Sequence, residues 1–391
     1  MARTVFVRRR PDSGLGNIRR SIIDPTRTVD WVLMAAVGAL SVIGLFIVYS
    51  ATRPRLLNRG LDPFSTVQRQ IVFLIIAIVA MVVVMWMDYV QLRGSAELFY
   101  AVALVLLVLV YVAGSVTGGA HLSFNLGPIA VQPSELAKVA TLLMLAGFLA
   151  DVDSRTLPYE AFIKSLFIVG APVVLVAIEP DLGSASVLVA CAMGVLLVAG
   201  AQFKYISLIT GLTVVSAVGG VVSGVVKSYQ LRRITGFLNQ NSDSASLAQL
   251  NTQVKFAKRA VATGGFWGKG YLKGPLTNGA FIPVQSTDFV FSALGEQFGM
   301  IGCVIVLLLF GLILYRIHRI ARMSQDRLGM LVCAGVFTMI LWQGFQNIGM
   351  TMGITPVSGV PLPFVSYGGS HTVAFAMMIG LVQSVHMRRF R

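Results

Sequence analysis

The sequence predicts an all-α protein that crosses a membrane about ten times. Hydrophobic residues make up 56% of its 391 residues, charged residues only 12%, and the mean hydropathy is +0.79. A chain of this composition has too few polar side chains to cover a soluble domain. Its apolar, charge-poor runs are mostly near the roughly 20 residues that a helix needs to span a bilayer. These runs cover residues 31–50, 70–87, 97–113, 134–150, 161–178, 183–200, 204–226, 289–315, 328–349 and 370–387.

The distribution of arginine predicts the orientation of these spans. An even number of spans places both termini on one side, and the positive-inside rule puts arginine-rich ends in the cytoplasm. Seven arginines precede the first span, three follow the last and four lie in residues 316–327, whereas residues 114–133 and 350–369 contain no Lys or Arg. We therefore predict cytoplasmic termini, with residues 1–29 as a tail and residues 30–391 as one membrane domain. The first outside loop departs from the rule, because it carries Arg53, Arg55, Arg59 and Arg69.

The net charge of +15 does not indicate a nucleic-acid-binding protein. Of the 31 cationic residues, 14 lie in the two tails and in residues 316–327, where membrane orientation and anionic lipid headgroups account for them. The three cysteines all lie in apolar runs, and the four histidines are scattered without the spacing of metal ligands. The sequence therefore predicts neither a structural zinc site nor redox chemistry.

The longest hydrophilic stretch, residues 227–288, indicates an anionic substrate. It carries eight Lys and Arg side chains but only two carboxylates, Asp243 and Asp288. Asp288 directly precedes the eighth span, among cations, where a general base would act on a phosphate-bearing substrate. Ser286, Thr287 and Asp288 before an apolar run are also typical of a helix N-cap, which is the structural alternative.

Two further segments of this loop have distinct patterns. Residues 249–262 space Lys255, Lys258 and Arg259 between apolar residues at near-helical intervals, which predicts an amphipathic helix on the outer leaflet. Residues 263–270 combine four glycines with Phe266, Trp267 and Lys269. Such a segment is either a flexible turn or a backbone surface that admits a sugar or a pyrophosphate close to the chain.

Charged residues at the ends of other spans are candidates for substrate contacts. Glu135 and Lys138 are three residues apart and share one face of the fourth helix. They form either a simple ion pair or a site in which Glu135 holds Lys138 toward a phosphate. Glu179 and Asp181 flank Pro180 in a short turn, which is either solvated turn chemistry or an acidic cluster able to bind a divalent cation or to orient Lys138.

Five motifs follow one another along residues 30 to 390. They are Gln132-Pro133-Ser134-Glu135, Pro180-Asp181-Leu182-Gly183, Gly264-Gly265 with Gly268-Lys269-Gly270, Thr287-Asp288-Phe289, and the run from Gly359 to Ser370. Together they resemble the SEDS family of shape, elongation, division and sporulation proteins. Asn347-Ile348-Gly349-Met350 followed by Ser358-Gly359-Val360-Pro361-Leu362-Pro363 is more similar to RodA, the elongation member, than to FtsW, the division member.

The resemblance implies a ten-helix peptidoglycan glycosyltransferase of the bacterial cytoplasmic (inner) membrane that polymerises lipid II. It places the catalytic aspartate on Asp288, as the base that removes a proton from the acceptor hydroxyl. It also implies a class B penicillin-binding protein as partner. A divalent cation, Mg²⁺ or Mn²⁺, is a further expectation, and no organic cofactor is expected. Substrate contacts are expected from Glu135, Lys138, Asp181, Arg259, Lys269, Thr287 and Ser366.

Three departures from the family pattern affect contacts near Asp288. Ser286 stands where His is common, His371 stands where Ser is frequent, and the Trp often found before Gln132 is missing. Two other functions remain open from the sequence: a lipid II flippase or related transporter, and a non-catalytic scaffold for cell-wall enzymes. Ser366 also has a structural alternative, as a local hydrogen-bonding residue of a Gly-Pro turn.

Overall fold

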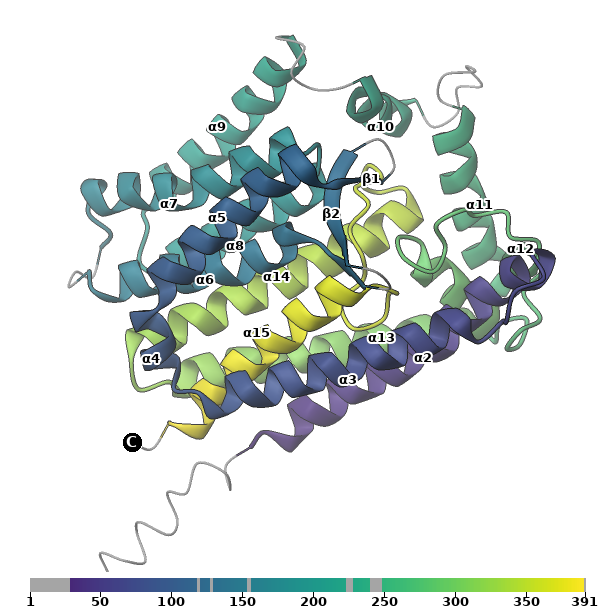
Figure 1. Cartoon of the computed structure of the whole chain (residues 1–391), viewed down its shortest axis with the longest axis horizontal. Helices are drawn as coiled ribbons and strands as arrows, with labels where there is room; N and C mark the ends of the chain where they lie inside the picture. Colours follow the sequence, from purple (N-terminus) through teal and green to yellow (C-terminus); the bar gives the residue numbers. More distant parts are fainter. Residues whose placement is uncertain are drawn as a thin grey trace, which may run out of the picture.

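The protein is an elongated bundle of helices (Figure 1). Its structure is a computed structural model, which describes residues 29–117, 120–126, 129–152, 156–222, 228–239 and 248–389. Most of the predicted cytoplasmic tail, residues 1–28, and Asp243 lie outside the described residues.

Each of the ten predicted spans forms a helix, which confirms the fold class. Seven of the described helices are long and apolar enough to cross a membrane, and α8 and α9 contain shorter apolar helices. The ten are α2 (Trp31–Asn58), α3 (Ser65–Trp86), α5 (Ala96–Ala113), α6 (Pro133–Ala150), α7 (Tyr159–Ile178), α8 (Leu182–Val198), α9 (Phe203–Val222), α13 (Val290–Met323), α14 (Arg327–Met352) and α15 (Gly369–Met387).

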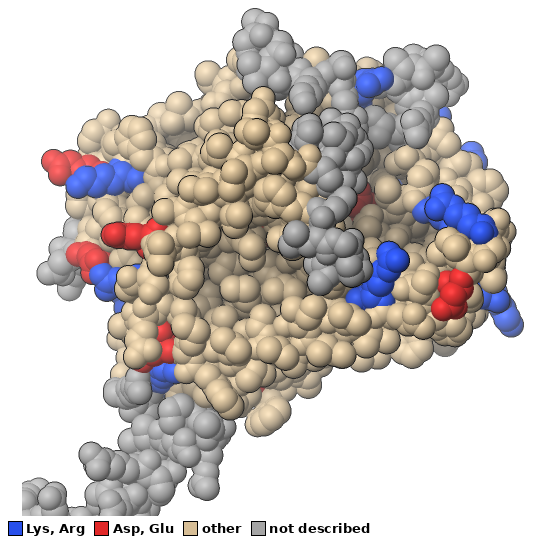
Figure 2. Space-filling model, viewed as in Figure 1, with Lys and Arg blue, Asp and Glu red and all other residues tan. Residues whose placement is uncertain are grey.

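The helices differ in how much of their surface the bundle covers. Most residues of α6, α14 and α15 are buried, so these three form the interior, whereas α2, α3 and α5 expose apolar faces. In Figure 2, charged side chains gather toward the two ends of the molecule, and the surface between them is almost without charge. An uncharged belt of this kind is what the hydrocarbon core of a bilayer requires.

At one end of the bundle, the residue before α2 contacts the C-terminal parts of α13 and α15. The Asp30 carboxylate accepts hydrogen bonds from Arg316 Nε at 2.8 Å and Nη2 at 2.5 Å. The backbone of Asp30 exchanges two hydrogen bonds of 3.0 Å with the Gln383 amide. The described chain therefore starts and finishes at the same end, as the even number of spans predicts.

The segment between α5 and α6 contains a small sheet that the sequence did not predict. Strands β1 (Ser115–Thr117), β2 (Ala120–Leu126) and β3 (Ile129–Val131) are antiparallel in the order β1-β2-β3. The Ser370 hydroxyl anchors this sheet to the start of α15, because it donates to the Ala130 carbonyl and accepts from the Gln132 N–H, both at 2.9 Å.

The long loop between α9 and α13 contains three helices: α10 (Ser228–Leu238), α11 (Ala248–Gly264) and α12 (Pro275–Asn278). Helix α11 confirms the predicted helix over residues 249–262 and packs against α13. These elements lie at the end of the bundle opposite the C-terminus (Figure 1), and they carry the candidate site.

Candidate functional site

Asp288 does not cap the helix that follows it. Helix α13 begins at Val290, its N-cap residue is Phe289, and no side chain makes a capping hydrogen bond there. The backbone instead turns at Val284, whose carbonyl accepts the Asp288 N–H at 3.0 Å. The helix-cap explanation of the Ser-Thr-Asp sequence is therefore wrong, and the Asp288 carboxylate is not used to start the helix.

Three different groups hold the three backbone carbonyls of residues 286–288. The Ser286 carbonyl accepts the Tyr367 N–H at 2.9 Å, and the Thr287 carbonyl accepts the Ser366 hydroxyl at 2.5 Å. The Asp288 carbonyl accepts the Asn347 amide at 2.8 Å. Because α14 and the segment before α15 supply these donors, the backbone that carries Asp288 is fixed from two sides.

The Asp288 carboxylate lies between charges of both signs. At Gly359 (φ +72°), a Cβ would lie 3.4 Å from Arg233 Nη1 and 3.7 Å from Asp288 Oδ2, so both groups converge over a residue without a side chain. Burial raises the pKa of Asp288 above its ordinary value and the charge of Asp181 adds to this, while a hydrogen bond from Thr287 and the charge of Arg233 oppose it.

Asp181 joins two of the sequence motifs beside this carboxylate. It is the N-cap of α8, where Oδ1 accepts the Ser184 N–H at 3.0 Å. Its other oxygen accepts from Gln132 Nε2 at 3.1 Å and lies 3.5 Å from Ser134 Oγ. Asp181 therefore completes the turn, as one of the two alternatives expects, and its charge also acts on Asp288. Its expected role in binding a divalent cation or orienting Lys138 stays a prediction.

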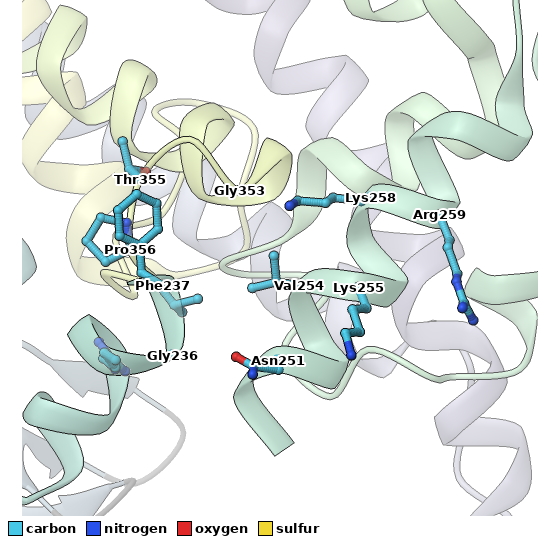
Figure 3. A pocket seen from close by; sticks show the side chains of 12 residues that line it. Gly236, Phe237, Asn251, Val254, Lys255, Lys258, Arg259, Gly353, Thr355 and Pro356 are labelled. Carbon is cyan, nitrogen blue, oxygen red and sulfur yellow. The ribbon is translucent and has the colours of Figure 1, made fainter. Parts of the chain in front are cut away.

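A cationic pocket of about 190 Å³ opens between α10, α11 and the segment after α14 (Figure 3). In Figure 3, Lys258 of α11 points toward the segment with Gly353 and Thr355. No carboxylate is among its lining residues, which are Arg233, Gly236, Phe237, Asn251, Val254, Lys255, Lys258, Arg259, Gly353, Thr355, Pro356 and Val357. Four cationic side chains around one concave space make the electrostatic potential there positive, which favours an anionic ligand.

Arg233 connects the pocket to Asp288. It lines the pocket, and its charge lowers the pKa of Asp288. In the sequence, Arg233 is one of eight cations of the loop, and nothing distinguishes it from the others. Asn347 belongs to a motif of the family, and the structure shows that it also holds the Asp288 carbonyl. A pattern along the chain gives no signal for either contact, because both partners are distant in sequence.

Of the two loop cations that were predicted to contact the substrate, one lies at the pocket and the other does not. Arg259 lines the pocket, with its guanidinium 6.0 Å from the centre of the Phe256 ring. Lys269 is exposed, and it is not among the residues that line the pocket. The structure thus brings Arg259 to the site, whereas the role of Lys269 as a substrate contact stays a prediction without geometric support.

Glu135 and Lys138 form a buried ion pair in the first turns of α6. Lys138 Nζ lies 2.7 Å from Glu135 Oε1, and the two side chains are 0% and 2% exposed. Neither residue lines the cationic pocket. The structure shows the ion pair that the spacing predicts and does not show Lys138 at the pocket wall.

Ser366 is fully buried, and the structure describes one local contact and one distant contact of its hydroxyl. It accepts the Leu362 N–H at 2.8 Å within its own turn, and it donates to the Thr287 carbonyl at 2.5 Å. The first contact is the local hydrogen bond of the structural alternative for Ser366, and the second joins this turn to the segment that carries Asp288. Its effect on the site passes through the backbone of Thr287, because its side chain does not reach solvent.

The glycine-rich segment approaches the protein's own backbone. A Cβ at Gly264 would collide with the Gly295 carbonyl, and one at Gly268 would collide with the Gln297 carbonyl, both in α13. The Lys269 N–H donates to the Glu296 carbonyl at 2.9 Å. The predicted close approach is present, and at Gly264 and Gly268 it packs the loop against the backbone of α13. A surface for a sugar or a pyrophosphate on this segment stays a prediction.

Arg55 accounts for part of the excess of cations in the first outside loop. Its guanidinium donates to the carbonyls of Ile282 and Pro283, just before the segment that carries Asp288. Its position therefore follows from a tertiary contact, which the positive-inside rule does not consider.

The described residues contain no group of three or more His, Cys, Asp or Glu side chains arranged to hold a metal ion. Asp181 is the carboxylate whose charge acts on Asp288 at the site. Carboxylate oxygens suit Mg²⁺, which usually takes one or two of them together with phosphate oxygens of a substrate. A divalent cation here would therefore need further ligands from a substrate.

Comparison with known proteins shows one family over nearly the whole chain. The family model for FtsW, RodA and SpoVE, described as "Cell cycle protein", matches residues 30–390. Stage V sporulation protein E of Bacillus subtilis (strain 168) is 33% identical over 359 residues, which are 91% of this chain and 96% of the relative. Peptidoglycan glycosyltransferase MrdB of Escherichia coli (strain K12) is 32% identical over 368 residues, 94% of each chain.

Solved structures have the same fold. A chain of a peptidoglycan synthase complex, whose structure concerns the coordination of polymerization and crosslinking, matches with a TM-score of 0.77 and 30% identity over 93% of this chain and 99% of that chain. The rod shape determining protein RodA of Thermus thermophilus matches with a TM-score of 0.69 and 28% identity over 93% and 98% of the two chains.

Proposed function

Because the chain belongs to the FtsW, RodA and SpoVE family of cell cycle proteins, we propose that it is a peptidoglycan glycosyltransferase that polymerises lipid II. Relatives of similar identity and coverage are named peptidoglycan glycosyltransferases, among them MrdB of Escherichia coli and RodA of Treponema pallidum. A cationic pocket beside a carboxylate suits this reaction, since the donor carries a lipid pyrophosphate.

In the proposed mechanism Asp288 is the general base. It removes the proton from the acceptor hydroxyl while that oxygen attacks the anomeric carbon of the donor sugar. One carbon–oxygen bond forms, the bond from the anomeric carbon to the pyrophosphate breaks, and the lipid pyrophosphate leaves with the electron pair. A raised pKa makes a carboxylate a stronger base, which suits this step.

The cations of the pocket stabilise the leaving group. The pocket is lined by four cationic side chains, so a pyrophosphate bound there would meet positive charge from Arg233, Lys255, Lys258 and Arg259. Fixed charges at the place where negative charge develops lower the barrier without reorganisation of the protein. A divalent cation held by Asp181 and Asp288 would supply further charge neutralisation to a bound pyrophosphate.

One observation carries the proposal: Arg233 belongs to both parts of the site. It lines the anion pocket and also acts on the Asp288 carboxylate. The base and the leaving-group pocket therefore share a residue, as a transfer reaction at one carbon requires. Neither a scaffold nor a passive lipid carrier needs this arrangement.

Two observations support a cellular role and a partner. Residues 347–350 and 358–363 resemble RodA, which supports a role in elongation and cell shape. The solved peptidoglycan synthase complex contains a similar chain, which supports a class B penicillin-binding protein as the transpeptidase partner. We place the end with Asp288 outside the bacterial cytoplasmic membrane and both termini in the cytoplasm, as the arginine distribution predicts.

The test is polymerisation of labelled lipid II by the purified protein, together with its transpeptidase partner and Mg²⁺ or Mn²⁺. We expect glycan chains from the wild type and a loss of at least about a hundredfold from Asp288→Asn, because the variant lacks a base. Undiminished polymer from Asp288→Asn would exclude the mechanism. Movement of lipid II across vesicle membranes without any polymer would support the transporter instead.

A further inference from the structure

We propose that Glu296, a buried acid of α13, is a positioning residue that fixes the segment carrying Asp288 through Thr277 and Gln285. This inference rests on the proposed function, because it assigns Glu296 a role in holding the base of that reaction. The sequence gives no signal for this role, because Glu296 lies within an apolar run that is typical of a membrane span.

Glu296 is fully buried and is held by the loop that precedes α13. Its Oε1 accepts the Leu276 N–H at 2.7 Å. Its Oε2 accepts the Thr277 N–H at 2.8 Å and the Thr277 hydroxyl at 2.6 Å. Three donors on one carboxylate, all from Leu276 and Thr277 of α12, compensate a charge that would otherwise be very unfavourable at 0% exposure.

The hydrogen bonds continue from Thr277 to the Asp288 segment. The Thr277 hydroxyl accepts from Gln285 Nε2 at 3.1 Å. The same nitrogen of Gln285 lies 3.3 Å from Ser292 Oγ, whose hydroxyl donates to the Phe289 carbonyl at 2.7 Å. The chain of contacts therefore reaches both ends of residues 285–289, and Asp288 lies between them.

Each of these side chains is shielded from water. Thr277 and Gln285 are 1% exposed, and Ser292 and Glu296 are 0% exposed. Hydrogen bonds in such a low-dielectric interior are strong, and a missing partner is costly. An apolar residue at position 296 would leave two backbone N–H groups without their acceptor, and α12 would lose its attachment to α13.

This network complements the three donors that hold the carbonyls of residues 286–288. Those donors come from α14 and from the segment before α15, whereas the Glu296 network attaches the same turn to α12 and α13. A base that must meet an acceptor hydroxyl within hydrogen-bond distance loses rate when its backbone shifts by a fraction of an ångström.

The experiment compares Thr277→Val with Thr277→Ser in the full-length protein. The two variants differ in the hydroxyl that joins Glu296 to Gln285, and valine has nearly the shape of threonine. We expect Thr277→Val to lower kcat for lipid II polymerisation about tenfold with KM nearly unchanged, and Thr277→Ser to keep near wild-type kcat. Hydrogen exchange over residues 272–289 should increase in the valine variant only.

Equal kcat in the two variants, or a change in KM alone, would overturn the positioning role. If Thr277→Val does not fold, Gln285→Met is the test. This variant retains the hydrogen bonds between Thr277 and Glu296 and removes the hydrogen bond from Gln285 to Thr277. We expect it to lower kcat about tenfold and to speed hydrogen exchange over residues 285–289. Wild-type kcat together with a wild-type exchange rate would reject the proposal.

Failure of the proposed function gives a different pattern. If the wild type makes no polymer, or if Asp288→Asn makes as much as the wild type, the assignment of the base is wrong, while hydrogen exchange still reports whether Glu296 holds the segment. If Asp288→Asn is inactive and Thr277→Val is fully active, the base stands and the positioning role fails.

Discussion

The two ends of the bundle use charge in opposite ways. At the end with the C-terminus, cations are joined to acids on other elements: Arg316 to Asp30, Arg93 to Asp151 and Arg388 to Asp88. At the end with α10, α11 and α12, four cations line one pocket whose lining contains no acid.

The comparison shows ion pairs between separate elements at one end and a concentration of positive charge around a concave space at the other. A paired charge that is partly buried contributes to stability, and its loss leaves its partner in an unfavourable environment. An excess of positive charge around a concave surface makes the electrostatic potential there positive, and an anion that fits the surface is bound favourably. Substitutions at the first end should therefore affect folding, and substitutions at the second should affect the reaction.

The largest effect is expected for Arg316→Ala, which leaves the fully buried Asp30 carboxylate without its cation. We expect a loss of about 3 kcal/mol in the free energy of unfolding, because a buried charge without its partner is strongly destabilising. Chemical denaturation in detergent micelles measures it. Arg319→Ala, at an exposed position one turn further along α13, is the control and should change stability by less than about 0.5 kcal/mol. Equal stability of the two variants would contradict the role given to this ion pair.

An intermediate effect is expected for Lys258→Gln in the pocket. We expect KM for lipid II to rise about tenfold, because a charge-assisted contact to a phosphate is lost. Lys269→Gln is the matched control, since Lys269 lies in the same loop but not in the pocket lining. Steady-state kinetics of polymerisation measures both. A larger increase for Lys269→Gln would place the pyrophosphate at the glycine-rich segment, against the geometry.

A smaller effect is expected for Ser366→Ala. The variant removes the hydrogen bond to the Thr287 carbonyl, so we expect kcat to fall about fivefold, as for the loss of roughly 1 kcal/mol, with KM unchanged. Ser370→Ala removes a similar hydroxyl that holds β3 instead, and it should retain wild-type kcat. A change in KM alone for Ser366→Ala would show that its hydroxyl contacts the substrate directly.

The sequence predicts the spans well because they depend on local composition. Each of the ten apolar runs is a helix, and the near-helical spacing of Lys255, Lys258 and Arg259 marks α11. The three strands between α5 and α6 escaped prediction, because two of them are three residues long and no alternating pattern distinguishes them.

The site was only partly predictable. Asp288 was found as an isolated acid in a basic loop. Arg233, Asn347 and Glu296 act through partners that are many residues away, so no local pattern identifies them. Gly264 and Gly268 correctly indicated that another group comes close to the backbone of this segment. The sequence does not say that the group is the backbone of α13.

The pH dependence of kcat/KM tests the central claim most directly, because a base accepts a proton only in its ionised form. As pH falls through the pKa of Asp288, activity should fall, and this decline should lie above the ordinary aspartate range near 3.9, since burial raises that pKa. Arg233 lowers the pKa and Asp181 raises it, so Arg233→Gln should move the decline to higher pH and Asp181→Asn to lower pH. A decline that neither substitution moves, or that both move in the same direction, would contradict Asp288 as the base.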